Sequence, residues 1–182
     1  MFDTNKKRII IAIDGMAGAG KTTIAERLAR LCDANVVHTD DFHIPFKLRT
    51  PNRLAEPGGN LHYEKMLKEV ILPLQEGKQL NFRPYDCKTG LMAAPRIFDD
   101  KILTIVEGTY SMHPKFGKYW DLAIFFDISP EEQLRRLSLR NGEKLSDFTD
   151  KWIPMETKYF EAFGIKEKAD YTWTEFQKLV KL

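Results

Sequence analysis

The stretch that decides the fold lies near the N-terminus, where residues 9–22 read IIIAIDGMAGAGKT. Its apolar run Ile9–Ile13, which is largely β-branched, is typical of a central parallel strand that is buried on both faces. The residues after Asp14 fit the pattern GxxxxGK[ST], and apolar residues at helical spacing follow at Ile24, Leu28 and Leu31. The stretch therefore predicts a strand, a glycine-rich turn and a helix, an arrangement whose backbone N–H groups face phosphate oxygens.

The chemistry of phosphate binding explains the residue types of this loop. Glycines allow the tight turn, and the start of the following helix adds the positive end of its dipole. We expect Lys21 to reach the β- and γ-phosphates of a nucleotide and the Thr22 hydroxyl to bind magnesium. The residues expected to bind the nucleotide are Gly15, Met16, Ala17, Gly18, Ala19, Gly20, Lys21, Thr22 and Thr23, joined by Arg135 further along the chain.

The rest of the chain alternates predicted strands with predicted helices. Strands are expected at 36–37, 79–84, 102–106, 122–128 and 169–173, and helices at 61–77, 130–140 and 147–163. Prolines and glycines between residues 43 and 60 predict a loop. The alternation is typical of a mainly parallel α/β sheet, here of about five strands, with helices on both faces. Ligands bind such sheets at the carboxyl ends of the strands.

Composition and charge exclude several classes of protein. The 182 residues carry 28 basic and 26 acidic side chains, a net charge of +2, which argues against binding to nucleic acid or to an anionic membrane. The apolar runs are too short for a membrane helix or a signal peptide. We therefore expect a single soluble domain, residues 1–182, in the cytoplasm, with Cys32 as a buried thiol at a helix end.

Acidic residues follow two of the predicted strands. Asp40 and Asp41 come after the strand at 36–37, and Glu107 comes after the strand at 102–106. Phosphoryl transfer to a hydroxyl needs a carboxylate that orients the hydroxyl and accepts its proton, and we expect Asp40 to do this. The alternative for the Asp pair is a pair of loop acids, one of which caps a helix. Glu107 is expected to hold magnesium.

Three arginines lie on the predicted helix that begins at Pro130. Arg136 and Arg140 share one face of it, and Arg135 lies beside them. Their alternatives are a solvated basic face or a short lid, approximately residues 135–148, whose positive charge closes over the transferring phosphate and excludes water. We expect the lid.

The segments IAIDGMAGAGKTT, TDDFHIP, IVEGTYSMHP and LRRLSLRNGE occur in this order. In this the chain resembles the uridine kinase and phosphoribulokinase superfamily, which includes nicotinamide riboside kinase, over roughly residues 8–173. The resemblance implies a P-loop NTPase fold, ATP and Mg²⁺ as cofactors, and phosphate transfer to a hydroxyl of a small metabolite, first of all a nucleoside or ribosyl-like compound. It also implies a small-molecule acceptor as partner, and a homo-oligomer, as uridine kinases often form. The implied catalytic residues are Asp40, Lys21, Arg136 and Arg140, and the implied metal ligands are Thr22 and Glu107.

The acceptor side departs from the family pattern. Tyr85 matches a tyrosine that lines the acceptor pocket in uridine kinases, but His62 stands where they carry a ribose-binding aspartate, and no histidine follows Tyr85-Asp86. His62 either contacts a hydroxyl or phosphate of another acceptor or lies at a helix start. Arg83 either meets an anionic acceptor or is a solvated loop charge. The residues expected to bind the acceptor are Asp41, His62, Arg83 and Tyr85.

A rival hypothesis is a regulatory NTPase that binds a nucleotide and has no small-molecule acceptor. The guanine-reading NKxD pattern of GTPases is absent from the chain. Asp40 separates the two hypotheses, because only the kinase needs a carboxylate that accepts the proton of an acceptor hydroxyl.

Overall fold

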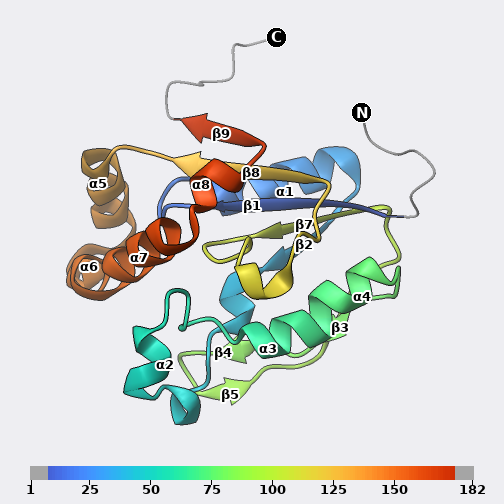
Figure 1. Cartoon of the computed structure of the whole chain (residues 1–182), viewed down its shortest axis with the longest axis horizontal. Coiled ribbons are helices and arrows are strands. Elements are labelled where there is room, and N and C mark those ends of the chain that lie inside the picture. Colours follow the sequence, from blue (N-terminus) through green and yellow to red (C-terminus); the bar gives the residue numbers. More distant parts are fainter. Residues whose placement is uncertain (1–7, 175–182) are drawn as a thin grey trace.

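The computed structural model describes residues 8–174 of the chain. Its centre is a five-stranded sheet in the order β2-β7-β1-β8-β9, in which every neighbouring pair is parallel (Figure 1). The strands are β1 (Ile9–Gly15), β2 (Asn35–His38), β7 (Leu103–Glu107), β8 (Leu122–Asp127) and β9 (Tyr171–Thr174). The predicted α/β fold with a mainly parallel sheet is therefore confirmed, and β1 is its central strand.

Helices cover both faces of this sheet, because its strands are apolar on both sides. On one face α1 (Lys21–Cys32) buries Ala25 among side chains such as Ile13, Ile105 and Phe126. The other face packs against a helical segment made of α3 (Tyr63–Met66), the π-helical η3 (Leu67–Ile71) and α4 (Leu72–Gln75), and against α7 (Ile153–Phe163) and α8 (Ile165–Lys168). Pro73 lacks an N–H for the regular helical ladder, and the wider π turn comes directly before it.

The predicted loop at 43–60 contains short elements that the sequence pattern does not reveal, and the segment after α4 forms more strands than the one expected at 79–84. The loop holds η2 (Phe46–Leu48) and α2 (Pro51–Ala55). Residues 81–97 form two small antiparallel pairs, β3 (Asn81–Phe82) with β6 (Arg96–Ile97) and β4 (Tyr85–Asp86) with β5 (Leu91–Met92). In Figure 1, α2, β4 and β5 lie at the opposite end of the molecule from β9.

The remaining helices surround the carboxyl ends of the strands or connect the core elements. They are η1 (Thr39–Phe42), η4 (Pro114–Phe116), α5 (Pro130–Asn141), η5 (Gly142–Lys144), α6 (Leu145–Asp147) and the π-helical η6 (Phe148–Trp152). Between residues 8 and 174, no helix combines the length and the apolar character needed to cross a bilayer.

The expectation of a buried thiol at Cys32 is wrong. The last turn of α1 is exposed, and both Cys32 and Leu31 lie at the surface, with Leu31 80% exposed. The chain reverses at Asp33, whose φ of 50° is left-handed, and burial resumes only at Ala34. The apolar face of α1 is therefore its earlier part, around Ala25.

Candidate active site

The glycine-rich loop connects β1 to α1 at the carboxyl edge of the sheet. Gly15 has a φ of 128°, and a Cβ there would lie 2.2 Å from the carbonyl oxygen of Phe126 in β8. The next residue, Met16, donates its N–H to that same carbonyl at 3.0 Å. Only glycine allows this close approach of β1 to β8, which starts the loop.

The Lys21 side chain folds back over this loop. Its Nζ donates to the carbonyl oxygens of Gly15 at 2.7 Å and Met16 at 2.9 Å, and to Thr109 Oγ1 at 3.4 Å. Lys21 is 8% exposed, and the hydrogen bonds of its ammonium go to neutral oxygens. The loop therefore presents a positive charge whose present partners are neutral oxygens, as a site for anionic phosphate requires.

A cavity of about 460 Å³ opens beside the loop. The structure brings to it most of the side chains predicted from the sequence, namely Lys21, Thr22, Thr23, Asp40, Glu107, Arg136 and Arg140. It also brings side chains to which the sequence analysis gave no role, namely His43, Asn60, Thr109, Tyr110, Trp152 and Glu156. The carboxyl end of β7, the segment after β2 and the start of α1 thus meet at one place, as expected for a parallel sheet.

Thr22 and Glu107 lie side by side at the edge of the cavity. The Thr22 hydroxyl donates to Glu107 Oε1 at 3.1 Å, and His38 Nδ1 lies 2.5 Å from the same oxygen. The hydrogen bond with Glu107 and its negative charge raise the pKa of His38 against the opposing effect of burial. Gly108 follows with a φ of 125°, and a Cβ there would lie 2.0 Å from Thr39 Oγ1.

These two oxygen ligands fit a magnesium ion. Mg²⁺ prefers oxygen, and in phosphate-transfer sites it takes few protein ligands and completes its shell with phosphate oxygens and water. No cluster of three or more His, Cys, Asp or Glu side chains that could form a complete metal cage occurs within residues 8–174. Thr22 and Glu107 would therefore hold the ion together with a bound nucleotide.

Asp14 is a buried carboxylate directly before the loop, and the sequence analysis gave it no role. Oδ1 accepts hydrogen bonds from the N–H groups of Gly15 at 2.7 Å and Tyr110 at 3.2 Å, and Oδ2 accepts from Met112 N at 2.9 Å and Tyr159 Oη at 2.8 Å. Its complete burial raises its pKa in spite of these bonds. Tyr110 is held with a φ of 84°, a left-handed conformation that is rare outside glycine and occurs often at functional sites.

Glu156 on α7 is a second buried carboxylate at the loop. It accepts the N–H of Ala17 at 3.0 Å and the side-chain amide of Gln133 at 2.6 Å, and Gln133 also donates to Ala17 O at 3.1 Å. Burial raises the pKa of Glu156, and the charge of Lys21 acts in the opposite direction. Helices α5 and α7 are therefore both bonded to the phosphate loop at Ala17.

The predicted lid arginines take different positions on α5. Arg136 donates from Nη1 to Gly18 O at 3.4 Å and from Nε to Glu132 Oε1 at 2.5 Å, and it lines the cavity. Arg140 also lines the cavity, with its guanidinium 5.5 Å from the Phe148 ring centroid. Arg135 is paired with Glu132 and does not line the cavity.

The comparisons with known proteins agree with this geometry. No family model matches the chain. A uridine kinase from Ureaplasma parvum is 24% identical, with 96% of this chain and 92% of that protein aligned. Uridine-cytidine kinase C from Dictyostelium discoideum is 25% identical over 84% of this chain, which spans 36% of that longer protein.

The structure of a possible uridine kinase from Bacillus stearothermophilus has a TM-score of 0.70 at 18% identity, and the match covers 94% and 91% of the two chains. The fold is that of the uridine kinase-like P-loop kinases. The sequence similarities support the same superfamily.

The four residues predicted to bind an acceptor, Asp41, His62, Arg83 and Tyr85, are not among those that line the cavity. Asp41 pairs with Arg96 at 2.5 Å, and Tyr85 is buried, with its hydroxyl accepting the N–H of Phe46 at 3.2 Å. The Arg83 guanidinium donates to the carbonyl oxygen of Ala93 at 2.8 Å. These contacts hold the segment that contains β4, β5 and β6.

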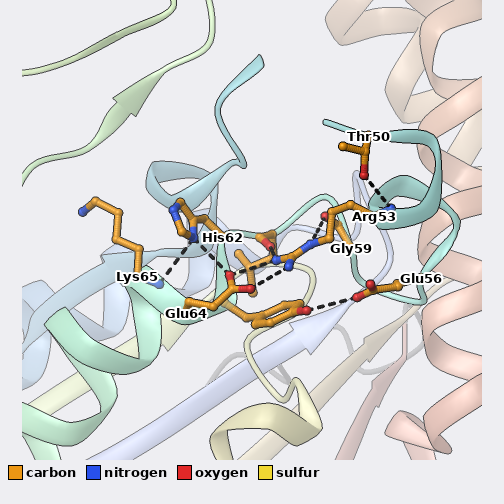
Figure 2. A network of polar contacts seen from close by, with 9 residues as sticks. Thr50, Arg53, Glu56, Gly59, His62, Glu64 and Lys65 are labelled. Carbon is orange, nitrogen blue, oxygen red and sulfur yellow. Dashed lines mark hydrogen bonds and ion pairs between the residues drawn. The ribbon is translucent and has the colours of Figure 1, made fainter. Parts of the chain in front are cut away.

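His62 is also engaged in structure, at the start of α3 (Figure 2). Its Nδ1 lies 3.1 Å from Glu64 Oε2 and 3.4 Å from the N–H of Lys65, in the position of an N-terminal cap. Of the two possibilities left open for His62, the described contacts are those of a residue at a helix start.

Of the site residues that the sequence patterns did not predict, some had a signal in the sequence and others had none. Asp14 had a signal, since an acid at the end of an apolar central strand must find partners inside the protein. Glu156 and Asn60 had none, because each meets its partners across long stretches of chain.

Proposed function

We propose that this protein is an ATP-dependent phosphotransferase that moves the γ-phosphate to a hydroxyl of a small metabolite, first of all a nucleoside or ribosyl-like compound. The observation that carries the proposal is that the Asp40 carboxylate faces the same cavity as the phosphate loop, Glu107 and Arg136. A loop for phosphate binding alone suits any NTPase. A carboxylate across the cavity from it suits a kinase, because an acceptor hydroxyl must lose a proton.

In the proposed reaction, the acceptor oxygen attacks the γ-phosphorus while the bond from that phosphorus to the bridging oxygen breaks. ADP leaves, and the hydroxyl proton passes to Asp40. Lys21 and the loop N–H groups hold the phosphates, and Arg136 and Arg140 supply positive charge from α5, the start of a lid at about residues 135–148. Magnesium held by Thr22 and Glu107 would neutralise charge on the β- and γ-phosphates.

The acceptor site in this proposal is formed by other residues than the family pattern implies. The polar and aromatic side chains that line the cavity with Asp40 include His43, Asn60, Tyr110 and Trp152. They offer neutral hydrogen-bonding groups and aromatic rings, which suit a hydroxylated small compound. We propose that this single domain acts in the cytoplasm on such a compound.

The substitution Asp40→Asn tests the proposal. It keeps the size of the side chain and removes the proton acceptor, so we expect kcat to fall by about 10²- to 10⁴-fold while the affinity for ATP is unchanged. The measurement is ADP release against a panel of nucleosides, ribosides, pantothenate and sugar phosphates, with nucleotide affinity from calorimetry.

The matched control is Asp33→Asn, which makes the same chemical change at an exposed residue at the far end of α1. It should leave both quantities unchanged. No acceptor-dependent ADP release from any compound of the panel would overturn the kinase proposal. Full biological activity of Asp40→Asn would favour the regulatory NTPase.

A further inference from the structure

A histidine and a buried asparagine lie next to Asp40 in the cavity. His43 Nδ1 is 3.2 Å from the side-chain nitrogen of Asn60, and His43 Nε2 is 3.8 Å from Asp40 Oδ1. The imidazole is nearly parallel to the indole of Trp152, with ring centroids 6.1 Å apart and an interplanar angle of 18°. His43 therefore lies between Asn60 and Asp40, with one ring nitrogen directed to each.

The backbone fixes this arrangement. His43 and Leu61 form an antiparallel bridge, Ile44 N donates to Asn60 O at 2.9 Å, and His62 N donates to Phe42 O at 2.7 Å. Asn60 is 1% exposed. Because two extended segments are paired on either side of the contact, the facing of the two side chains does not depend on flexible loops.

The orientation of the Asn60 amide decides which ring nitrogen of His43 carries the proton. As placed, the amide nitrogen of Asn60 donates to His43 Nδ1, which leaves the ring proton on Nε2, facing Asp40. If the amide were turned over, its oxygen would require a proton on Nδ1. A neutral ring would then direct a lone pair at the Asp40 carboxylate, which is repulsive, and only a charged ring would satisfy both neighbours.

The surroundings of His43 disfavour the charged ring. Burial lowers the pKa of His43, and the positive charges of Arg49 and Lys151 act in the same direction, against the negative charges of Asp40 and Asp41. Asn60 Oδ1 has no hydrogen-bond partner among the described residues, so the side-chain contact of the amide is the one with His43. With a neutral imidazole beside Asp40, the favourable arrangement is the one in which the amide nitrogen donates to Nδ1 and Nε2–H faces the carboxylate.

We propose that Asn60 is a positioning residue that holds His43 as the Nε2–H tautomer, and that this N–H orients the Asp40 carboxylate toward the acceptor hydroxyl. The inference rests on the proposed kinase function. The separation of 3.8 Å is longer than a hydrogen bond, and contacts of this kind often shorten when the substrate binds. A neutral donor orients a carboxylate without the full charge that would make it a weaker base, and this suits a group that must accept a proton.

Nuclear magnetic resonance of ¹⁵N-labelled histidine reads the tautomer directly. The chain has 4 histidines, so the His43 signals are assigned by their loss in His43→Gln. We expect a neutral Nε2–H ring at pH 7. In Asn60→Asp the carboxylate can only accept, so the proton should move to Nδ1 and the His43 titration midpoint should rise by about one unit or more. Asn81→Asp makes the same charge change at an exposed residue of β3 and should alter neither the tautomer nor the titration midpoint of His43.

Steady-state kinetics then test the orienting role. Asn60→Asp should lower kcat about tenfold or more with the KM for ATP unchanged. Because this variant places a carboxylate in a buried position, a second pair guards against misfolding. His43→Gln keeps an N–H donor near the Nε2 position and should retain most of kcat. His43→Phe removes the donor and should lose most of kcat.

Several results would overturn the inference. A wild-type His43 that is charged or carries its proton on Nδ1 at pH 7 contradicts the tautomer, and so does a tautomer that Asn60→Asp leaves unchanged. Wild-type kcat in both Asn60→Asp and His43→Phe contradicts the orienting role. If the wild-type protein has no kinase activity, the proposed function fails, while the resonance experiment still decides whether Asn60 sets the tautomer.

Discussion

At the scale of single residues, one oxygen of Glu107 serves two partners. Thr22 and His38 both contact Oε1, and the side chain of Glu107 is 4% exposed. A carboxylate this deeply buried needs compensation, which a nearby cation supplies better than a neutral hydroxyl does. The contact with Glu107 raises the pKa of His38 and so favours its protonated form, in a position where bound magnesium would supply positive charge instead.

The contact makes stability depend on pH in a defined direction. Because the folded-state pKa of His38 is raised above 6.5, its contribution is fully present below pH 6.5 and is lost as the pH rises through the raised pKa. We expect His38→Gln to be less stable than the wild type in mildly acid solution and to approach it at alkaline pH. Urea unfolding at a series of pH values in magnesium-free buffer measures this. A difference that grows with increasing pH would contradict the ion pair.

At the scale of elements, the segment from Thr50 to Lys65 folds around one arginine (Figure 2). The Arg53 guanidinium donates to the carbonyl oxygens of Gly59 at 3.0 Å and Leu61 at 2.9 Å, and makes two bonds, at 2.6 and 3.0 Å, to the carboxylate of Glu64. It also lies 3.7 Å from the centroid of the Tyr63 ring. The network holds the backbone on both sides of Asn60, so it supports the part of the cavity that Asn60 lines.

Arg53→Lys should destabilise the protein by about 1–3 kcal/mol, because a lysine cannot make the paired bonds to Glu64 while also bonding both carbonyl oxygens. Urea unfolding measures the loss. Arg30→Lys, on the exposed last turn of α1, is the matched control and should change little. An equal effect of both substitutions would mean that the Arg53 network contributes nothing specific.

The same network also makes the stability of the protein depend on pH in acid solution. Partial burial acts to raise the pKa of Glu64, but the hydrogen bonds and charge of Arg53, together with hydrogen bonds from the Glu64 backbone and His62, outweigh it and lower that pKa to about 2. The stabilisation is present above pH 4.5 and is lost as the pH falls toward 2. The stability gap between the wild type and Arg53→Lys should therefore narrow below pH 4.5.

Sequence patterns predicted the elements that are determined locally and missed those that depend on distant partners. The strand at Ile9–Ile13 and the helix that begins at Pro130 follow from apolar period, proline position and caps, all of which lie within a few residues. The strand Tyr85–Asp86 pairs with Leu91–Met92, and its two residues are too few to show an alternating apolar pattern. For the site, the phosphate loop and the acids at strand ends were predictable because the parallel sheet brings such ends together. The positions of His62 and Arg83 depend on side-chain bonds that no periodicity reports.

At the scale of the whole molecule, two buried carboxylates connect the phosphate loop to the rest of the fold. Asp14 links the end of β1 to the loop after β7 and to Tyr159 on α7, and Glu156 on α7 bonds the loop at Ala17 together with Gln133 on α5. Movement of α5 and α7 is therefore mechanically coupled to the loop. This coupling is what a lid formed by α5 and the following residues would need.

Asp14→Asn tests the central connection. An amide nitrogen in place of Oδ1 could not accept from the N–H groups of Gly15 and Tyr110, and one in place of Oδ2 could not accept from Met112 N, so at least one buried donor would lose its partner. We expect a loss of about 3 kcal/mol or more in the free energy of unfolding.

Tyr159→Phe is the graded control for this change. It removes only the hydroxyl donor and leaves the backbone bonds of Asp14 intact, so its expected cost is about 1 kcal/mol. The measurement is urea unfolding of both variants and of the double mutant. Because both substitutions act on the same hydrogen bond, the double mutant should lose less free energy of unfolding than the sum of the two single losses. Full additivity would show that Asp14 and Tyr159 act independently, and that α7 is not held to β1 through this contact.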